Sequence, residues 1–263
     1  MAGARELLYG RRSAADFDTS PPRVDLNIDD DLVLADVTLH YSLYELPSDV
    51  VVDLLPKSLH PTHPGVLAIT FWRVPNSPVG PFVVATVGVA CRAAIKPRHF
   101  VLASFTSTQA AAELLRSRFG CDPRVTAVEQ RLYNDAAISS VAIDGDKVVE
   151  ISTGLLRNIS GSSAGLKISP QLNLARVGDS HQLVQTEVSY DFHRTQRGRG
   201  QLAITDRRVI GLPGHGRLWP IASSVASVEV TLQPVRFALD IDEPPESRPS
   251  RRLRPALSAP RGA

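Results

Sequence analysis

Residues Val33–Leu43 read VLADVTLHYSL, and apolar and polar side chains alternate along them. One set consists of Val33, Ala35, Val37, Leu39, Tyr41 and Leu43, and the other of Leu34, Asp36, Thr38, His40 and Ser42. A period of two places successive side chains on opposite faces of a β-strand. The stretch therefore predicts a long strand with one apolar face and one largely polar face.

Strand signals continue along most of the chain. Apolar and β-branched runs bounded by Pro and Gly occupy residues 65–74, 81–91, 99–105, 138–143, 147–153, 183–192, 201–212 and 236–241. Helix signals are few: they cover 48–55, 108–119 (stopped by Gly120) and, as a third candidate, 221–228. Many strands with two or three short helices predict an α+β, mainly β fold, built as a closed or nearly closed antiparallel barrel.

The two ends of the chain differ in composition from its middle. Residues 1–24 carry charges throughout and contain the pair Pro21-Pro22, and residues 243–263 are rich in Pro, Arg and Ser. Segments with so few apolar residues bury too little surface to fold on their own. We therefore expect a flexible N-terminal arm (1–24), one folded domain (25–242) and a disordered tail (243–263).

Composition excludes several classes of protein. The net charge is only +2, and basic residues are not interleaved with aromatic ones, so we expect no nucleic-acid partner. No run approaches the roughly 18 apolar residues of a membrane helix, and the first residues lack the apolar core of a signal peptide. We therefore expect a cytoplasmic protein with no membrane partner.

The sequence also carries no metal or cofactor motif. Cys91 and Cys121 make neither a disulfide framework nor a zinc site, and we expect both to be buried. His60 and His63 are three residues apart in a proline-bounded loop, and no third ligand accompanies them. We therefore expect neither a metal ion nor a cofactor.

The order of several short motifs resembles the acetoacetate decarboxylase-like family. The motifs are Tyr41-Ser42-Leu43-Tyr44 followed by Leu54-Leu55-Pro56, then Gly80-Pro81-Phe82, the segment 105–120 with Glu113, Leu166-Lys167-Ile168-Ser169-Pro170, and Leu218-Trp219-Pro220-Ile221. The resemblance spans nearly all of 25–242. It implies a cone-shaped antiparallel barrel around an apolar cavity, assembly into homo-oligomers, and small β-keto acids or related carbonyl compounds as substrates.

The sequence departs from this family where the family's chemistry takes place. There a lysine amine condenses with a ketone, and the iminium accepts the electrons that carbon dioxide leaves behind. The resemblance places that lysine within residues 117–120, the cavity glutamate at Val84 and an arginine near Val37, and none of these positions holds the family's charged residue. Arg118 cannot replace the lysine, because a guanidinium group stays protonated. Schiff-base decarboxylation is therefore expected to be lost.

The resemblance leads to a predicted site and leaves alternatives open. We expect an apolar cavity that binds a small apolar or keto-acid-type ligand and is lined by Val37, Leu39, Tyr41, Val84 and Phe119. The opposite face of the first strand, including His40, should then face outward or a subunit contact. One alternative is a lyase, cyclase or hydrolase of secondary metabolism that uses other polar residues, with His40, Glu113 and Arg116 as weak candidates. Another is a structural or interaction protein whose cavity is filled.

Overall fold

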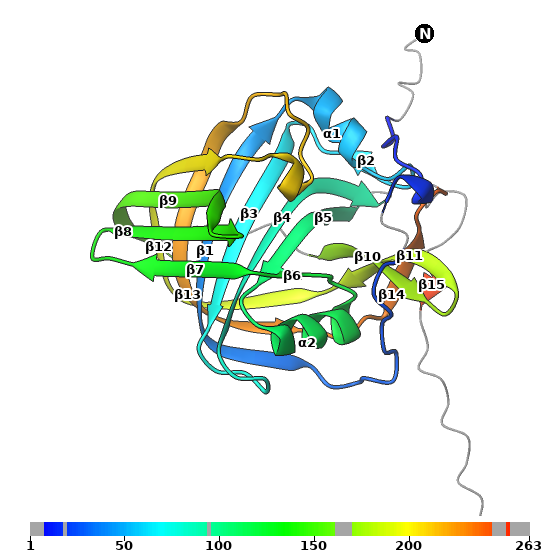
Figure 1. The fold of residues 1–263 in the computed structure, drawn as a ribbon, viewed down its shortest axis with the longest axis horizontal. Coiled ribbons are helices and arrows are strands. Elements are labelled where there is room, and N and C mark those ends of the chain that lie inside the picture. Colours follow the sequence, from blue (N-terminus) through cyan, green and yellow to red (C-terminus); the bar gives the residue numbers. More distant parts are fainter. Residues whose placement is uncertain (1–7, 18–19, 94–95, 161–169, 244–250, 253–263) are drawn as a thin grey trace, which may run out of the picture.

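A computed structural model of the chain describes residues 8–17, 20–93, 96–160, 170–243 and 251–252. Figure 1 shows one extended, strongly curved sheet with two short α-helices, α1 (Ser48–Leu54) and α2 (Gln109–Phe119). The described residues also contain two short 3-10 helices, η1 (Ala14–Asp16) and η3 (Arg208–Ile210). No helix of the described part is long and apolar enough to cross a membrane.

The strands form a single hydrogen-bonded sheet. They are β1 (Leu32–Leu46), β2 (His60–Pro61), β3 (Gly65–Val74), β4 (Phe82–Ala93), β5 (Lys96–Thr106), β6 (Arg124–Val125), β7 (Ala127–Leu132), β8 (Ala136–Ile143), β9 (Asp146–Ile159), β10 (Gln171–Val177), β11 (Ser180–Thr186), β12 (Val188–Ile204), β13 (Trp219–Leu232), β14 (Phe237–Asp240) and β15 (Arg251–Arg252). Their order across the sheet is β15-β14-β11-β10-β5-β4-β3-β1-β13-β12-β9-β8-β7, with β2 beside β4 and β6 beside β5.

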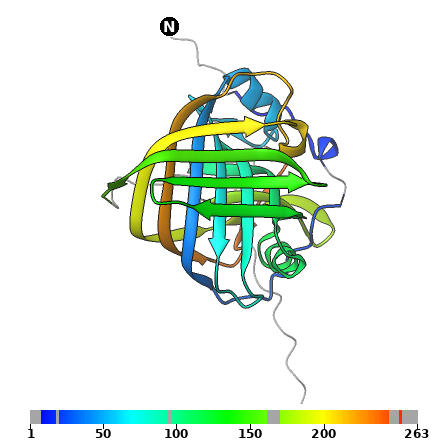
Figure 2. The ribbon, with the colours of Figure 1, turned by 60° about the vertical axis from the view of Figure 1, so that its left-hand side comes forward.

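The mainly β class predicted from the sequence is confirmed, but the sheet is curled rather than closed. Strands β15 and β7 end the hydrogen-bonded path and do not pair with each other. Strand β7 lies against β4 and β5 without pairing to them. Figure 2 shows β7, β8 and β9, in green, crossing in front of the blue and cyan strands. The curl therefore covers part of one sheet face with another part of the same sheet.

Strand β1 contains a β-bulge that the alternating pattern does not reveal. Its register with β13 shifts between Leu34 and Val37, and Asp36 has a positive φ of 55°. A bulge inserts an extra residue, and that residue changes which side chains share a face. As a result Leu34 and Val37 pack in the same hydrophobic cluster, whereas Val33 is 52% exposed. Val33 and Val37 therefore do not share the buried face that strict alternation predicts.

The predicted third helix over 221–228 is wrong. These residues lie within β13, which pairs with β1 on one side and β12 on the other. Val228, Val230 and Leu232 alternate along it as buried residues. Pairing on both sides and burial of one face decide the conformation, because strand preference depends mostly on cross-strand packing.

The described part of the N-terminal segment is hydrogen bonded to the domain. The Gly10 amide donates to the Leu59 carbonyl, and the Lys57 amide donates to the Arg12 carbonyl. Further along, the Val24 amide donates to the Arg176 carbonyl. Residues 8–17 and 20–24 thus make backbone hydrogen bonds to the domain, and the division into arm, domain and tail stays a prediction. Most of the predicted tail falls outside the described residues, although β15 pairs with β14.

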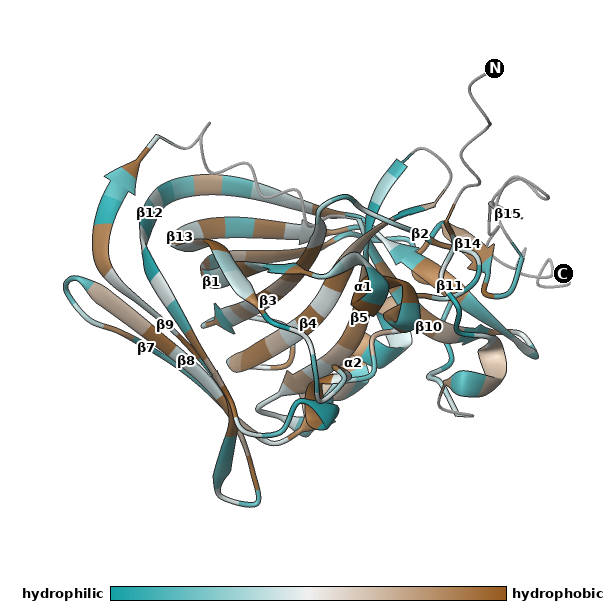
Figure 3. Cartoon of the chain, turned by 90° about the horizontal axis from the view of Figure 1, so that it is seen from above, coloured by the Kyte–Doolittle hydropathy of each residue, from teal (hydrophilic) through white to brown (hydrophobic). Residues whose placement is uncertain are grey.

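Buried side chains divide between the two faces of the sheet. Figure 3 shows hydrophobic residues along most of β3, β4 and β5. One cluster joins β3 and β4 to β8 and β9, with members such as Phe71, Val87 and Ile151. The other lies beneath α2 and contains Val37, Leu39, Tyr41, Trp72, Val84, Phe119, Val228 and Val230. We call the sheet surface that carries this second cluster the α2 face.

Candidate functional site

Helix α2 is fixed at both of its ends. The Thr108 hydroxyl at the N-cap accepts a hydrogen bond from the Ala111 amide at 3.3 Å. At the C-cap, Gly120 adopts a left-handed conformation with φ 62°. A Cβ atom on Gly120 would also lie 2.6 Å from the Ala175 Cβ atom. The chain therefore turns at Gly120, and Phe119 points into the core with 1% exposure.

The structure brings together the residues predicted to line a cavity. Val37, Leu39, Tyr41, Val84 and Phe119 belong to one cluster on the α2 face. Leu39 pairs with Trp72 on β3, and Trp72 pairs with Val84 on β4. Directly paired residues of antiparallel strands project from the same face. The register thus places these side chains together on one face of the sheet. Whether they line a cavity stays a prediction.

The sheet curls around this face. Strands β3 and β12 are separated in the sheet by β1 and β13. Even so, the Trp72 ring on β3 meets the Tyr190 ring on β12 edge to face, with centroids 6.1 Å apart. Phe192 lies next to Tyr190 at a centroid distance of 5.9 Å. The α2 face is therefore concave in this region, with an aromatic contact across it.

Several polar atoms on this concave face are buried and have no hydrogen-bond partner. They are Trp72 Nε1, Tyr190 Oη, Thr195 Oγ1 and Ser224 Oγ. Thr195 pairs with Ala226, which pairs with Leu39, and Ser224 pairs with Tyr41, so their side chains share the face of the predicted lining. In most proteins, buried polar atoms find partners. Sequence reasoning missed this set, although the alternation in 183–192 places Tyr190 among the apolar residues.

The hydrophobic cluster of the α2 face is uncharged, and Arg197, which pairs with Ser224 and so projects from the same face, is exposed at its margin. Arg118 has its guanidinium 5.9 Å from the Phe119 ring, but it forms an ion pair with Asp30 at 3.2 Å. Burial raises the pKa of the Tyr190 hydroxyl well above its ordinary value, so the group stays protonated. The buried part of the face therefore presents hydroxyl and indole groups among apolar side chains.

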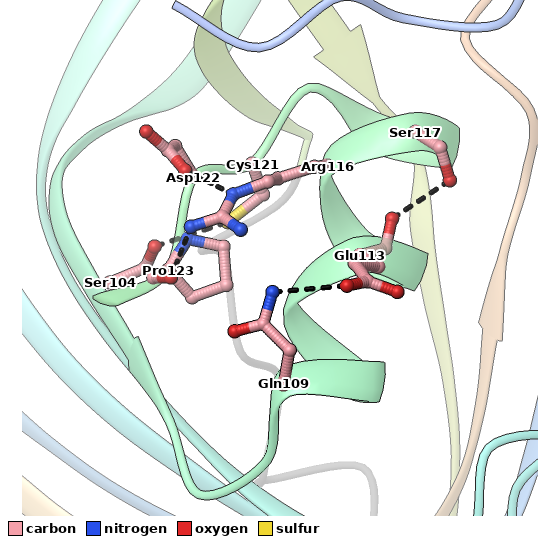
Figure 4. A network of polar contacts seen from close by, with 8 residues as sticks. All are labelled: Ser104, Gln109, Glu113, Arg116, Ser117, Cys121, Asp122 and Pro123. Atoms are coloured by element: carbon pink, nitrogen blue, oxygen red, sulfur yellow. Dashed lines mark hydrogen bonds and ion pairs between the residues drawn. The ribbon is translucent and has the colours of Figure 1, made fainter. Parts of the chain in front are cut away.

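Glu113 and Arg116 do not join this site. Figure 4 shows both on α2, with Glu113 accepting a hydrogen bond from Gln109 Nε2 at 3.0 Å. Arg116 Nε contacts Asp122 Oδ1 at 2.5 Å, and its Nη2 donates to the Pro123 carbonyl at 3.2 Å. These contacts hold the connection between α2 and β6 in place. Both side chains also line an open pocket on α2 together with Pro22 and Arg23, and a catalytic role for them stays a prediction.

His40 lies on the opposite face of β1, and the prediction that it faces outward is wrong. It is fully buried, with Nδ1 2.7 Å from Ser139 Oγ and Nε2 2.8 Å from Thr153 Oγ1. Strands β8 and β9 supply these partners, because the sheet folds back over the polar face of β1. Burial lowers the pKa of His40 to about 3, so the ring is neutral near pH 7. Since no part of the side chain is exposed, a catalytic role has no support in this geometry.

A separate pocket of about 370 Å³ opens beside the end of α2. One wall is the part of β5 from Val101 to Ser104. This part lies between the residues that pair with β10 (His99 and Phe100) and those that pair with β6 (Phe105 and Thr106). Its other walls include Arg12 and Phe17 from the N-terminal segment, together with Asn173. None of the five residues of the predicted cavity lining contributes to it. Within the described chain, no group of His, Cys, Asp and Glu side chains is arranged to hold a metal ion.

Among the comparisons with known proteins, the one with solved structures gives matches. No protein-family model and no curated protein sequence matches the chain. Among solved structures, an acetoacetate decarboxylase from Legionella pneumophila superposes with a TM-score of 0.68 at 15% identity, covering 83% of this chain and 91% of that one. The chain has the acetoacetate decarboxylase-like fold.

Two further structures support this assignment of the fold. An acetoacetate decarboxylase-like enzyme from Sphingomonas wittichii RW1 has a TM-score of 0.64 at 10% identity, covering 81% of this chain and 95% of its own. The enduracididine biosynthesis enzyme MppR, in complex with the condensation product of pyruvate and imidazole 4-carboxaldehyde, has a TM-score of 0.63 at 15% identity, covering 83% and 97%. The acetoacetate decarboxylase-like fold implied by the short motifs is thus confirmed.

Proposed function

We propose that this protein binds a small apolar or keto-type ligand against the α2 face and does not catalyse Schiff-base decarboxylation. The observation that carries the proposal is the set of buried polar atoms without partners on that face: Trp72 Nε1, Tyr190 Oη, Thr195 Oγ1 and Ser224 Oγ. Each unsatisfied buried group costs about 1–3 kcal/mol. A ligand that forms hydrogen bonds to these atoms recovers that free energy, so the face favours an occupant with polar as well as apolar parts.

The loss of Schiff-base chemistry follows from the segment 117–120. An iminium requires a primary amine, and this segment reads Ser117-Arg118-Phe119-Gly120. Within this segment Phe119 is buried, and Arg118 forms an ion pair with Asp30. Of the two alternatives, an enzyme using His40, Glu113 and Arg116 is disfavoured, because His40 is fully buried against β8 and β9, away from Glu113 and Arg116 on α2. A structural or interaction protein with a filled interior stays the second alternative, because the same polar atoms are buried.

Two measurements test the proposal. Incubation with acetoacetate and borohydride should leave Lys57, Lys96, Lys147 and Lys167 unmodified by mass spectrometry. Stoichiometric trapping at any of them would overturn the loss of Schiff-base chemistry, and Lys167, which lies outside the described residues, is the first to examine.

Native mass spectrometry of protein purified from its own host should show a small molecule that is lost under denaturing conditions. The same spectrum gives the number of subunits. On the basis of the resemblance we propose that the protein is a homo-oligomer. A cytoplasmic location is part of the same proposal, and fractionation of host cells tests it. A native mass equal to that of the bare chains at every charge state would contradict ligand binding.

A further inference from the structure

We propose that the pocket of about 370 Å³ beside α2 binds a short peptide of two or three residues in extended conformation. The α-carboxylate of the peptide binds at Arg12, and its α-ammonium group binds at Asp122. This pocket is separate from the α2 face, so the peptide site is independent of the function proposed above. Four features of the pocket carry the proposal: a free strand edge, apolar walls, a guanidinium at one end and a carboxylate at the other.

The first feature is an unpaired stretch of a strand edge. Strand β5 pairs with β4 on one side. On its other side, among the described strands, β10 pairs only with His99 and Phe100, and β6 only with Phe105 and Thr106. Residues 101–104 lie between these pairs, line the pocket and have no described strand beside them there. A free edge presents main-chain N–H and C=O groups, and an extended peptide is the chemical complement of such an edge.

The second feature is the set of apolar walls around this edge. A volume of about 370 Å³ is within the range of small-ligand sites, which is about 300–1,000 Å³. The Phe17 ring meets the Phe100 ring edge to face, with centroids 5.8 Å apart, so the N-terminal segment forms one wall against β5. The other apolar lining residues include Pro21, Pro22, Leu102 and Leu174. Such walls favour a peptide with aliphatic side chains.

The third feature is Arg12, a lining residue that forms no ion pair with any described residue. Its Nη2 donates to the Asp16 carbonyl, and its guanidinium carbon lies 3.8 Å from the centroid of the Phe17 ring. The Asp16 carboxylate acts on Arg12 electrostatically, but it accepts hydrogen bonds from the amide and hydroxyl of Ser13. Because Phe17 packs on Phe100, Arg12 lies toward the Phe100 end of the free edge. A guanidinium group binds a carboxylate through two parallel hydrogen bonds.

The fourth feature is Asp122, the other charged residue of the lining. Cys121 Sγ lies 3.3 Å from Ser104 Oγ, so the next residue, Asp122, lies at the Ser104 end of the free edge (Figure 4). Asp122 is exposed, and its Oδ1 contacts Arg116 Nε at 2.5 Å. Its Oδ2 makes no hydrogen bond or ion pair with a described residue. A carboxylate can accept several hydrogen bonds, so an ammonium group can bind at Oδ2 beside the existing pair.

The positions of the two charges fix the length and direction of the peptide. Residues 101 to 104 span three steps of about 3.3 Å, or about 10 Å in total. Two or three extended residues cover about 7–10 Å. With its carboxylate at the Phe100 end and its ammonium group at the Ser104 end, the peptide runs antiparallel to β5.

Changes to the peptide test the site on the unaltered protein. Isothermal titration calorimetry with the tripeptide Ala-Leu-Ala should show binding. The carboxy-terminal amide and the N-acetyl form of the same tripeptide should each bind about tenfold more weakly, because each lacks one terminal charge. Hydrogen exchange should show slower exchange within residues 101–104 when Ala-Leu-Ala is bound. Strand β7, at the end of the sheet path, is the control and should exchange at the same rate with and without the peptide.

Variants of the protein test which end binds where. Arg12→Gln should weaken the binding of Ala-Leu-Ala about tenfold and leave the Kd of the amide unchanged, because the amide has no carboxylate. Arg11→Gln, which alters a neighbouring arginine that pairs with Asp53 at 2.7 Å, is the matched control and should change neither Kd. Asp122→Asn should weaken Ala-Leu-Ala and leave the Kd of the N-acetyl form unchanged.

Several results would overturn the peptide site. They are the absence of Ala-Leu-Ala binding at concentrations up to about 5 mM, equal affinity for the three peptides, and binding without slower exchange in residues 101–104. Equal weakening of the acid and the amide by Arg12→Gln would show that Arg12 does not bind the carboxylate, and would overturn the proposed orientation. If a variant does not fold, the three peptides on the wild-type protein still decide. None of these results bears on ligand binding at the α2 face.

Discussion

Replacing His40 by alanine is expected to destabilise the protein strongly at neutral and higher pH. The ring is fully buried and bridges Ser139 Oγ and Thr153 Oγ1 at 2.7 and 2.8 Å. The substitution opens a cavity between β1 and β8–β9 and removes a hydrogen-bond partner from each hydroxyl. Together these losses should lower the free energy of unfolding by about 2–4 kcal/mol at pH 8.

The same residue should make stability depend on pH in the wild-type protein. In the unfolded chain the imidazole titrates near its ordinary pKa of 6.5, whereas burial lowers the pKa to about 3 in the folded protein. Between these values only the unfolded chain takes up the proton, so the contribution is complete above pH 6.5 and is lost as the pH falls. From pH 7 to pH 5 the loss due to His40 should be about 2 kcal/mol.

Urea unfolding at pH 8, 7, 6 and 5 measures this effect. The difference between wild type and His40→Ala should shrink by about 2 kcal/mol from pH 7 to pH 5. His99 is also buried, with its pKa lowered to about 4, but it is present in both proteins and cancels from the difference. His215→Ala, at an exposed turn, is the control and should follow wild type. A His40→Ala loss below about 1 kcal/mol at pH 8, or a difference that does not vary with pH, would refute the buried neutral bridge.

Two further predictions concern burial on either side of the sheet. Val37→Arg places an unpaired charge in the buried α2 face and should lower the free energy of unfolding by about 3 kcal/mol or more. Val33→Arg, at a 52% exposed position of the same strand, should change the free energy of unfolding by less than about 0.5 kcal/mol. Equal urea midpoints for the two variants would contradict the register shift at the bulge. Cys91 and Cys121 are buried, with their thiol pKa values raised to about 12 and 11, so a thiol reagent should modify them at pH 8 only as fast as the protein unfolds. Rapid modification of either thiol in the native protein would argue against its burial.

Much of the fold could be predicted from local patterns. The alternation in β1 identified a long two-faced strand, and the Thr108 and Gly120 caps defined α2 because both signals depend on neighbouring residues. The convergence of Val37, Leu39 and Tyr41 with Val84 and Phe119 required the resemblance, since these residues come from distant segments. Their grouping in one cluster shows that the motif order carried real spatial information.

The errors have physical causes that a local pattern does not contain. Period-two alternation shows that β1 has two different faces, but not what covers each of them. The burial of His40 depends on β8 and β9, about a hundred residues away along the chain, which fold back over the polar face. The bulge at Asp36 is a single-residue change in register, and the sequence around it still alternates. The segment 221–228 is short enough that cross-strand partners decide its conformation.

The three charged residues that the resemblance implies, and that this sequence lacks at the matching positions, have to be considered as a set. A lysine placed alone at a buried position of the segment 117–120 would be desolvated, and desolvation would lower its pKa toward the neutral amine that a Schiff base needs. It would still lack the glutamate and arginine that the resemblance places at Val84 and Val37 to handle an acidic substrate. Conversely, either of those charges without the lysine would be a buried ion with no partner, which costs several kcal/mol. With none of the three, the hydrophobic cluster of this face is uncharged, which is consistent with the proposed role of binding a ligand rather than transforming it.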